Sequence, residues 1–335
     1  MGGGDLSEYL SEIKRSHVVD EIKYTGTSTE ILTVIENKSI ITTLQWEEHH
    51  QETIDISKTN LLDFTVDVMG LKTLILNKKI KQLTFTGDLS AISDLKAEHP
   101  RKGAFLEIVL LSKTITKLPN FDLPELFSLQ LQLFNIDIKE VCQYYPALKH
   151  ISFWGYPGYL YNVKALKHLF SLSSIFIGDL FGYQPEDFPN PEELSSVTSI
   201  VMESIPKDVS IHIKKQFKHL YLDITKLRNE KWLEENLDNP FRMWDGRNGI
   251  PPTHFKKAFN AYKNLNSVID SNPSPKELKV HFKAFIQVFN KLNSSKSPLE
   301  TMEMDEMVVA YLELCKKAQL DTKEMQALLE KEMHL

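Results

Sequence analysis

One six-residue motif recurs along the first two thirds of the chain and constrains its fold more than any other feature. An apolar residue is followed by two free positions, a second apolar residue, one free position and a third apolar residue. Residues 148–153, Leu-Lys-His-Ile-Ser-Phe, are a clear copy. The last two apolar residues are two apart, so they face the same side of a short strand. Ten copies are spaced 19 to 25 residues apart and begin at residues 19, 41, 61, 80, 105, 126, 148, 172, 197 and 217.

A regular period of this length is typical of a solenoid, in which each coil completes its core only against its neighbours. Segments between the copies, 28–38, 138–145 and 163–170, have apolar residues at helical spacing. We therefore expect an α/β solenoid with strands on one side and helical segments on the other. The alternative is an ordinary α/β protein with leucine-rich strands. The copy at residue 80 also competes for register with a second one at 71–76.

From residue 19 to about 225, the motif and its spacing resemble those of an irregular leucine-rich-repeat protein. The resemblance implies a horseshoe of about ten coils, with the free positions of the motif on its concave surface. In this family, Asn or Cys usually follows the last apolar residue by three positions. Here that column is missing, since Asn135 lies somewhat later and Gly155 or Asp179 lies only near it. Other groups must supply the backbone hydrogen bonds that the column would make.

Three regions follow from these patterns: an N-terminal helical cap over 1–18, a leucine-rich-repeat domain over 19–228 and a C-terminal all-α helical domain over 229–335. The cap is expected as a helix over 5–15, because residues 6, 9, 10 and 13 are apolar. A short helix is expected over 229–237. In the following bundle, Thr253 and Asp321 begin helices, and Ser-Pro-x-Glu capping boxes at 274–277 and 297–300 begin two more.

The segment 239–250, with its Asn-Pro-Phe and Trp-Asp pairs, is similar to C-terminal extensions of some bacterial leucine-rich-repeat proteins. That resemblance implies no known chemistry. Asp245 and Arg247 lie in it, and we expect a structural role for both: Asp245 bonded to the backbone of a buried turn, with Arg247 covering it.

Composition excludes several classes of function. The chain has 39 basic and 45 acidic residues, a net charge of −6, and neither half is basic enough for nucleic-acid binding. No apolar run approaches the roughly 18 residues of a membrane span. The N-terminus lacks a basic and then apolar signal region, and Cys142 and Cys315 have no metal or redox spacing. We therefore expect a cytoplasmic protein.

Sequence motifs of catalysis are also missing. The chain has no glycine-rich phosphate loop, no Gly-x-Ser-x-Gly turn and no His-Glu-x-x-His helix. His49 and His50 beside Glu47 and Glu48 form the densest group of possible metal ligands, but adjacent histidines project apart on a strand. We expect no enzyme activity, no cofactor and no metal.

The free positions of the motif change character along the chain. Early copies have polar residues such as Thr25, Thr65 and Thr84, whereas later copies have large apolar ones. Exposed aromatic residues carry much of the binding energy at protein interfaces. The sequence therefore predicts a non-enzymatic module that binds an unidentified protein partner on the concave or edge surface, a role that a bacterial immunity or inhibitor protein would fill. The predicted partner-binding residues are Trp154, Tyr156, Tyr159, Phe176, Tyr183, Val201 and Tyr221.

Three alternatives remain open at this point. In the first, these aromatic residues pack against one another, and in the second, the C-terminal bundle covers them. A groove between the solenoid and the helical domain would instead hold a small ligand or an enzyme's substrate.

Overall fold

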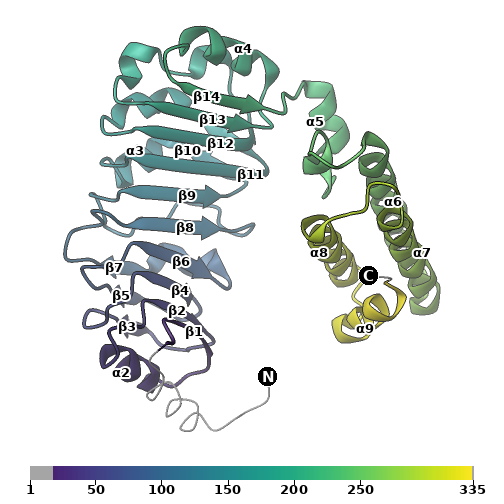
Figure 1. Ribbon diagram of the computed structural model, residues 1–335, viewed down its shortest axis with the longest axis horizontal. Coiled ribbons are helices and arrows are strands. Elements are labelled where there is room, and N and C mark those ends of the chain that lie inside the picture. The colour runs from purple at the N-terminus through teal and green to yellow at the C-terminus, as the bar shows by residue number, and fades with distance from the viewer. Residues whose placement is uncertain (1–17, 334–335) are drawn as a thin grey trace. The chain divides into compact units, whose positions relative to one another are not determined.

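The computed structural model describes residues 18–333, and the helical cap expected over 1–18 lies almost wholly outside them. The chain divides into two compact units between Leu227 and Arg228, one residue before the expected boundary. The unit up to Leu227, here called unit 1, contains the motif copies. The unit from Arg228, called unit 2, is helical (Figure 1).

A parallel sheet whose strands follow chain order forms the centre of unit 1 (Figure 1). β10 (Asn135–Asp137) adds to the far end of β11 only. The order confirms the α/β class with a parallel sheet and is compatible with a solenoid. The ten strands along this path, within residues 18–333, are β1 (Glu21–Thr25), β2 (Thr43–Glu47), β4 (Asp63–Asp67), β6 (Gln82–Thr86), β8 (Glu107–Leu111), β9 (Ser128–Gln132), β11 (His150–Tyr161), β12 (Ser174–Phe181), β13 (Ser199–Glu203) and β14 (Tyr221–Thr225).

Strand register explains why the motif recurs. The second apolar residues of nine copies pair with one another from strand to strand, and each is at most 2% exposed. Full burial of one such side chain stabilises the fold by about 1.5 to 3 kcal/mol. The continuous row therefore joins these nine strands into one core. Its members are Ile22, Leu44, Phe64, Leu83, Ile108, Leu129, Ile151, Ile175 and Ile200.

The last copy was placed two residues too early. Ile200 pairs with Leu222 and not with Leu220, which precedes the strand and is only partly buried. Phe217, expected to begin this copy, is fully buried, so the turn before β14 is longer than the motif allows. Side chains alternate along a strand, so a shift of two residues leaves Tyr221 facing outward. It now heads the strand instead of lying in its middle.

Phe105, expected in the core, is 66% exposed, and the neighbouring Leu106 is buried in its place. The buried residue before β8 thus stands two positions before Ile108, whereas the motif has three. Gly103 has a φ of +93° and its carbonyl accepts a hydrogen bond from the amide of Leu106, with Phe105 itself at φ +68°. The tight turn therefore points the Phe105 ring into solvent.

A second, three-stranded parallel sheet resolves the competition between 71–76 and the copy at residue 80. It contains β3 (Thr53–Asp55), β5 (Thr73–Ile75) and β7 (Lys96–Glu98). Both competing segments are strands, since Leu74 lies in β5 and Leu83 in β6. Asn77 holds the turn between them: its Nδ2 donates to the carbonyl of Leu61 at 2.9 Å, and its Oδ1 accepts from the amide of Ile80 at 2.8 Å. One buried asparagine thus does locally what the missing column would do.

Short helical segments connect the strands. The predicted helices over 28–38 and 138–145 are confirmed as α2 (Glu30–Glu36) and α3 (Ile138–Tyr144), whereas 163–170 is the 3₁₀ helix η2 (Val163–His168). Near the missing column, the buried Ser204 donates its hydroxyl hydrogen to Asp179 of the preceding coil at 3.1 Å. The remaining connections include η1 (Leu89–Asp94), η3 (Pro185–Asp187), η4 (Pro191–Leu194) and α4 (Lys207–Gln216).

In unit 2, the N-caps at Ser274 and Asp321 are confirmed, because their side chains accept hydrogen bonds from the amides of Glu277 and Glu324. The start predicted at 297–300 is wrong by about one turn, since α8 follows Glu300. The carbonyl of Ser297 instead contacts the buried His254 ring at 3.1 Å. The helical elements are α5 (Glu230–Asn236), η5 (Arg242–Trp244), α6 (Pro252–Asp270), α7 (Pro275–Asn293), α8 (Thr301–Lys317) and α9 (Thr322–Glu332).

Segment 239–250 is fixed to the bundle by a polar network. The Arg247 guanidinium donates to Glu303 at 2.7 Å and to Glu306 at 2.8 Å, and the buried Trp244 indole donates to Glu306 at 2.5 Å. Arg247 therefore pairs with α8 and does not cover Asp245 as expected.

Asp245 does not bond the backbone as expected either. Its carboxylate accepts from the Arg228 guanidinium and from the Trp232 indole, both at 2.7 Å. The Arg228 guanidinium also lies 3.7 Å from the centre of the Trp232 ring. These bonds hold α5 to the segment, which supports the structural role predicted for Asp245.

The row of inward side chains predicts a contrast between two isoleucines of unit 1. Ile175 is 1% exposed, so Ile175→Ala should lower the free energy of unfolding by about 2 to 5 kcal/mol through lost burial and a residual cavity. Ile211 on α4 is 58% exposed, and Ile211→Ala should change it by about 0.5 kcal/mol or less. Urea unfolding followed by circular dichroism measures both. Equal losses would contradict the assignment of the core.

The Arg247 network generates a second prediction. Arg247→Ala leaves the Glu303 carboxylate, whose side chain is 5% exposed, buried without its cation. A loss of about 3 kcal/mol is expected in urea unfolding. Adding Glu303→Gln should recover part of that loss because it removes the buried charge. Lys276→Ala, at an exposed position on α7, is the control and should have little effect. If the double variant is no more stable than Arg247→Ala, the network does not carry this energy.

Candidate protein-binding surface

Outward-facing side chains cover the face of the large parallel sheet opposite the core. Each strand contributes its first, third and fifth residues, because side chains alternate. The fifth positions of the motif copies form the middle row as far as Val201, and Asp223 takes the place of Tyr221 at its end. That row reads Lys23, Gln45, Thr65, Thr84, Val109, Gln130, Ser152, Phe176, Val201 and Asp223.

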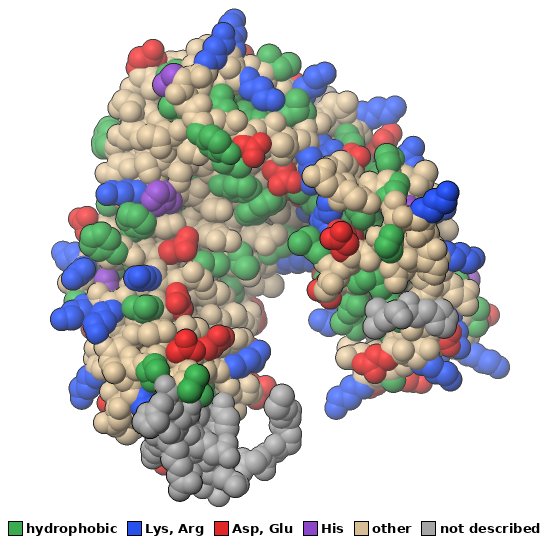
Figure 2. Space-filling model, in the orientation of Figure 1, with side chains coloured by type: hydrophobic (Ala, Val, Ile, Leu, Met, Phe, Trp, Pro, Cys, Tyr) green, Lys and Arg blue, Asp and Glu red, His purple; other side chains and the backbone are tan. Residues whose placement is uncertain are grey.

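The chemistry of this face changes along the sheet. Over β1 and β2 it is polar, and Glu47 accepts a hydrogen bond from Gln45 at 2.7 Å and lies 3.6 Å from the Lys23 ammonium. Larger apolar groups lie over the later strands. In Figure 2, hydrophobic side chains gather over the part of unit 1 where Figure 1 labels β8 to β13. The gradient predicted from the sequence is therefore present on the folded surface.

Trp154 and Phe176 come together as predicted. Their ring centres are 4.6 Å apart, and both side chains are half-buried. The indole also lies against Gly178 on β12, where an added Cβ would stand 2.5 Å from its ring. Glycine at this position therefore lets the tryptophan lie close to the sheet. Val201 extends the pair, since it is the direct partner of Phe176 on β13.

Tyr156 and Tyr159 lie further along β11, beyond an irregularity between Trp154 and Gly158. Tyr156 packs against Phe134 with ring centres 5.3 Å apart, and partial burial raises the pKa of its hydroxyl. Tyr159 is exposed and lies beside Tyr161. Tyr156 and Tyr159 therefore lie toward the carboxyl end of β11, beyond the contact between Trp154 and Phe176.

Tyr183 does not belong to the surface. It is 3% exposed, and its hydroxyl has no hydrogen-bond partner among the described residues. Gly182 precedes it with a φ of +83°, and the chain turns there so that the ring enters the core. Burial raises the pKa of this hydroxyl. The prediction of Tyr183 as a partner-binding residue is therefore wrong.

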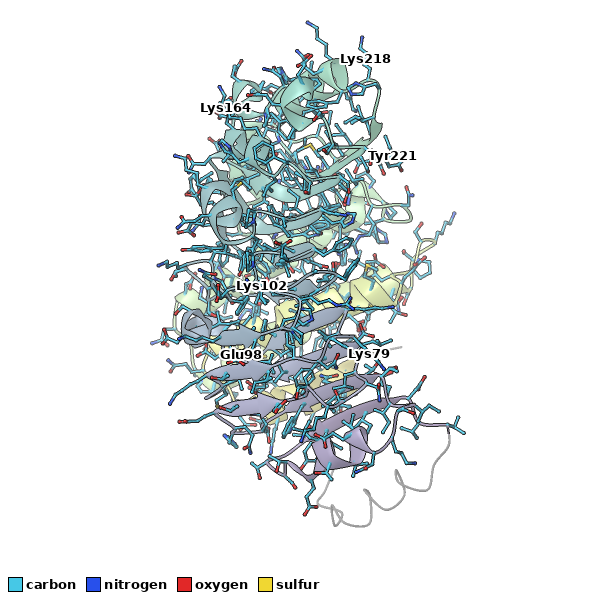
Figure 3. All side chains as sticks on the ribbon, turned by 90° about the vertical axis from the view of Figure 1, so that its left-hand side faces the viewer. Lys79, Glu98, Lys102, Lys164, Lys218 and Tyr221 are labelled. Atoms are coloured by element: carbon cyan, nitrogen blue, oxygen red, sulfur yellow. The ribbon has the colours of Figure 1, made fainter. Side chains whose placement is uncertain are left out.

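Tyr221 is on the surface but stands apart from the other predicted residues. It is 65% exposed and heads β14, two strands beyond β12. Figure 3 shows it projecting from the upper part of unit 1, away from the labelled Glu98 and Lys102. Those two residues line a different cavity of about 430 Å³ beside β7, whose walls mix charged and apolar groups.

A groove of about 610 Å³ lies on the outward face, near the amino-terminal ends of β6 to β12. The ring centre of Phe127 is 6.2 Å from that of Phe105 and 4.8 Å from that of His150. Phe176 also lines the groove, and its ring contacts that of Trp154. We call this set the aromatic patch; its members are Phe105, Phe127, His150, Trp154 and Phe176.

Three members of the aromatic patch were not predicted as site residues. Phe105 was assigned to the core. Phe127 and His150 occupy the second and third positions of their motif copies, whereas the predicted residues of the motif occupy its fifth position or follow it. A comparison of those earlier positions would have found both. The turn that exposes Phe105 has no comparable signal.

Positive charge surrounds the groove. The Arg101 guanidinium lies 5.8 Å from the centre of the Phe105 ring, and the Lys149 ammonium lies 5.8 Å from that of Phe127. Lys81 lines the groove itself. Glu107 is the acidic residue in its lining, and it accepts a hydrogen bond from the Ser128 hydroxyl at 2.9 Å. The patch therefore combines apolar rings with a basic rim.

One histidine–serine pair lies at the patch. His150 Nδ1 is 2.7 Å from the Ser174 hydroxyl, with no carboxylate bonded to the ring. Among residues 18–333, no three His, Cys, Asp or Glu side chains gather as a metal site would require. His49, in the densest cluster of the sequence, is buried and accepts from the amide of Gln51.

Comparison with known proteins adds no identity. No family model matches the chain, and no curated protein gives a significant match to its sequence. Across the residues described, no helix combines the length and the apolar character needed to cross a membrane.

Two buried tyrosines provide a test of the reassigned Tyr183. Tyr183→Phe removes a buried hydroxyl that has no partner, so it should be neutral or stabilise the protein by up to about 1 kcal/mol. Tyr145→Phe is the matched control: it removes a 2.6 Å bond to the carbonyl of Pro119 and should cost about 1 kcal/mol or more. Urea unfolding measures both. A loss of stability in Tyr183→Phe would mean that its hydroxyl has a partner in solution.

Proposed function

We propose that this protein is a non-enzymatic recognition module that binds a protein partner through the aromatic patch. The observation that carries the proposal is the groove of about 610 Å³ on a regular sheet face, lined by Phe105, Phe127 and Phe176. Blocking a partner, as an inhibitor or immunity protein does, is one role that such a surface serves.

We also propose that unit 1 is an irregular leucine-rich-repeat solenoid. Its strands pair in chain order, 19 to 25 residues apart, and their inward positions align. Neighbouring coils that share one core explain this spacing. The buried hydrogen bonds of Asn77 and of Asp179 with Ser204 stand in for the missing asparagine column. These features support the resemblance without a matching family model.

Exposed aromatic groups support the choice of surface. Folding alone does not require a phenylalanine ring that is 66% exposed, as Phe105 is. Phe127, Phe176 and Trp154 are half-buried and held by neighbouring rings, so they lose little conformational freedom when a partner covers them. Truncation of such a residue at the centre of an interface typically costs about 2 kcal/mol or more.

A small ligand is the second candidate, because the groove's volume falls within the usual range for ligand sites. Such sites normally place several unpaired polar groups to orient the ligand. Here the Ser128 hydroxyl already donates to Glu107, and His150 already contacts Ser174. An exposed Phe105 beside the groove also fits a broad protein contact better than an enclosed ligand.

The proposed function predicts which substitutions weaken binding. With the full chain as bait, a partner is captured from a native lysate, and its affinity is measured by isothermal titration calorimetry. Phe127→Ala and Trp154→Ala should each weaken binding about 30-fold, equivalent to about 2 kcal/mol. Thr65→Ala and Thr84→Ala change small residues over β4 and β6, outside the patch, and should leave the affinity unchanged.

Thermal melts separate binding from packing. If Phe127→Ala and Trp154→Ala lower the melting temperature by several degrees and do not change the affinity, these rings stabilise the fold and the proposed surface is wrong. A purified chain that retains a small organic molecule at the groove, detected by mass spectrometry under native conditions, would favour the ligand alternative.

A further inference from the structure

We propose that the aromatic patch binds an acidic segment of a protein partner, with one aromatic or large aliphatic side chain of that segment in the groove. The inference rests on the proposed function and adds the chemistry of the partner. It is carried by the basic residues around the groove and by the bonding of the polar groups on its floor.

The first observation is uncompensated positive charge. Lys81, Arg101 and Lys149 take part in no ion pair among the described residues. Some lysines elsewhere in unit 1 do form ion pairs, such as Lys72 with Glu52 at 2.8 Å and Lys226 with Glu203 at 2.7 Å. Three cations and the Glu107 carboxylate give the groove and its rim a formal charge of three minus one, or +2. A chain of net charge −6 thus presents a local basic site.

Two of these cations are held beside the apolar rings. Arg101 lies near Phe105 and Lys149 near Phe127, each 5.8 Å from the ring centre. An exposed cation–π contact contributes about 0.5 to 1 kcal/mol and limits the positions of the charged group. The N–H groups that do not face the ring stay available to a carboxylate. One partner segment can therefore contact a ring and a cation together.

The floor of the groove favours an apolar group. Glu107 and Ser128 are hydrogen-bonded to each other, as are His150 and Ser174. A polar group entering between them would lose water and meet groups that already use part of their hydrogen-bonding capacity on each other, which favours an apolar side chain. An aromatic or aliphatic side chain would instead cover the Phe127 and Phe176 rings. Acidic residues on either side of it would then lie over Arg101 and Lys149, away from Glu107.

A random-peptide display library selected against the full-length chain provides the test. Enriched peptides should have one Phe, Tyr, Trp or Leu flanked by Asp or Glu. The best peptide, synthesised with a fluorescent label, should bind more weakly at higher salt, because exposed charges are screened. Its affinity should fall at least about tenfold in Arg101→Glu or Lys149→Glu, and also when its own acids are replaced by amides.

Two control variants separate the possible outcomes. Lys139→Glu reverses an exposed charge on α3 and should leave peptide binding unchanged. Phe127→Ala, in contrast, removes the ring without changing charge and should abolish binding. Circular dichroism melts of each variant establish that it is folded.

The experiment tests the acidic character of the partner and the location of the binding surface separately. Peptides that need Phe127 but have neutral or basic flanks, or that ignore Arg101→Glu and Lys149→Glu, would overturn the acidic partner and leave the proposed function standing. Enriched peptides that bind Phe127→Ala as well as they bind the unaltered chain would overturn this inference at the groove. If the captured partner also ignores Phe127→Ala and Trp154→Ala, the proposed function fails as well.

Discussion

Parallel pairing of strands in fixed register is the constraint on which the rest of unit 1 depends. Each coil is too thin to enclose a core, so its two inward side chains must meet those of the coils above and below. The row from Ile22 to Ile200 satisfies that requirement. The same pairing determines the outward positions, because side chains alternate along each strand. A motif selected for the core thereby sets out three rows of surface positions.

The outward rows are free to serve recognition because the core does not use them. His150 and Trp154 lie on β11, Phe176 lies on β12, and Phe127 directly precedes β9. The strand register brings the Phe127 ring against His150 and the Trp154 ring against Phe176. Small residues assist this arrangement, since Gly178 leaves space for the Trp154 indole. Rings supported by paired strands form a more rigid surface than rings on loops, which is an advantage for binding.

Unit 2 is stabilised by a different balance of interactions. Phe241 and Trp244 of its segment 239–250 are buried, and charged residues lie beside them in the same segment. Arg247 compensates Glu303 and Glu306, and Arg228 compensates Asp245. The charged side chains of Asp245 and Arg247, which lie close together in the sequence, are thus accounted for by these ion pairs. A binding site is better sought where charged side chains form no ion pair within the described residues, as is true of Lys81, Arg101 and Lys149 around the groove of unit 1.

The positions of most strands, their inward residues and several helix starts can be predicted from the sequence, because they depend on local spacing and on side chains such as Ser274 that bond the nearby backbone. Tertiary structure decided the turns. It placed Phe105 in solvent, turned Tyr183 into the core and delayed the last strand by two residues. Phe127 and His150 became neighbours only through pairing of β9 with β11. The physical reason is that alternation within a strand is local, whereas the length of a turn is set by the coil against which it packs.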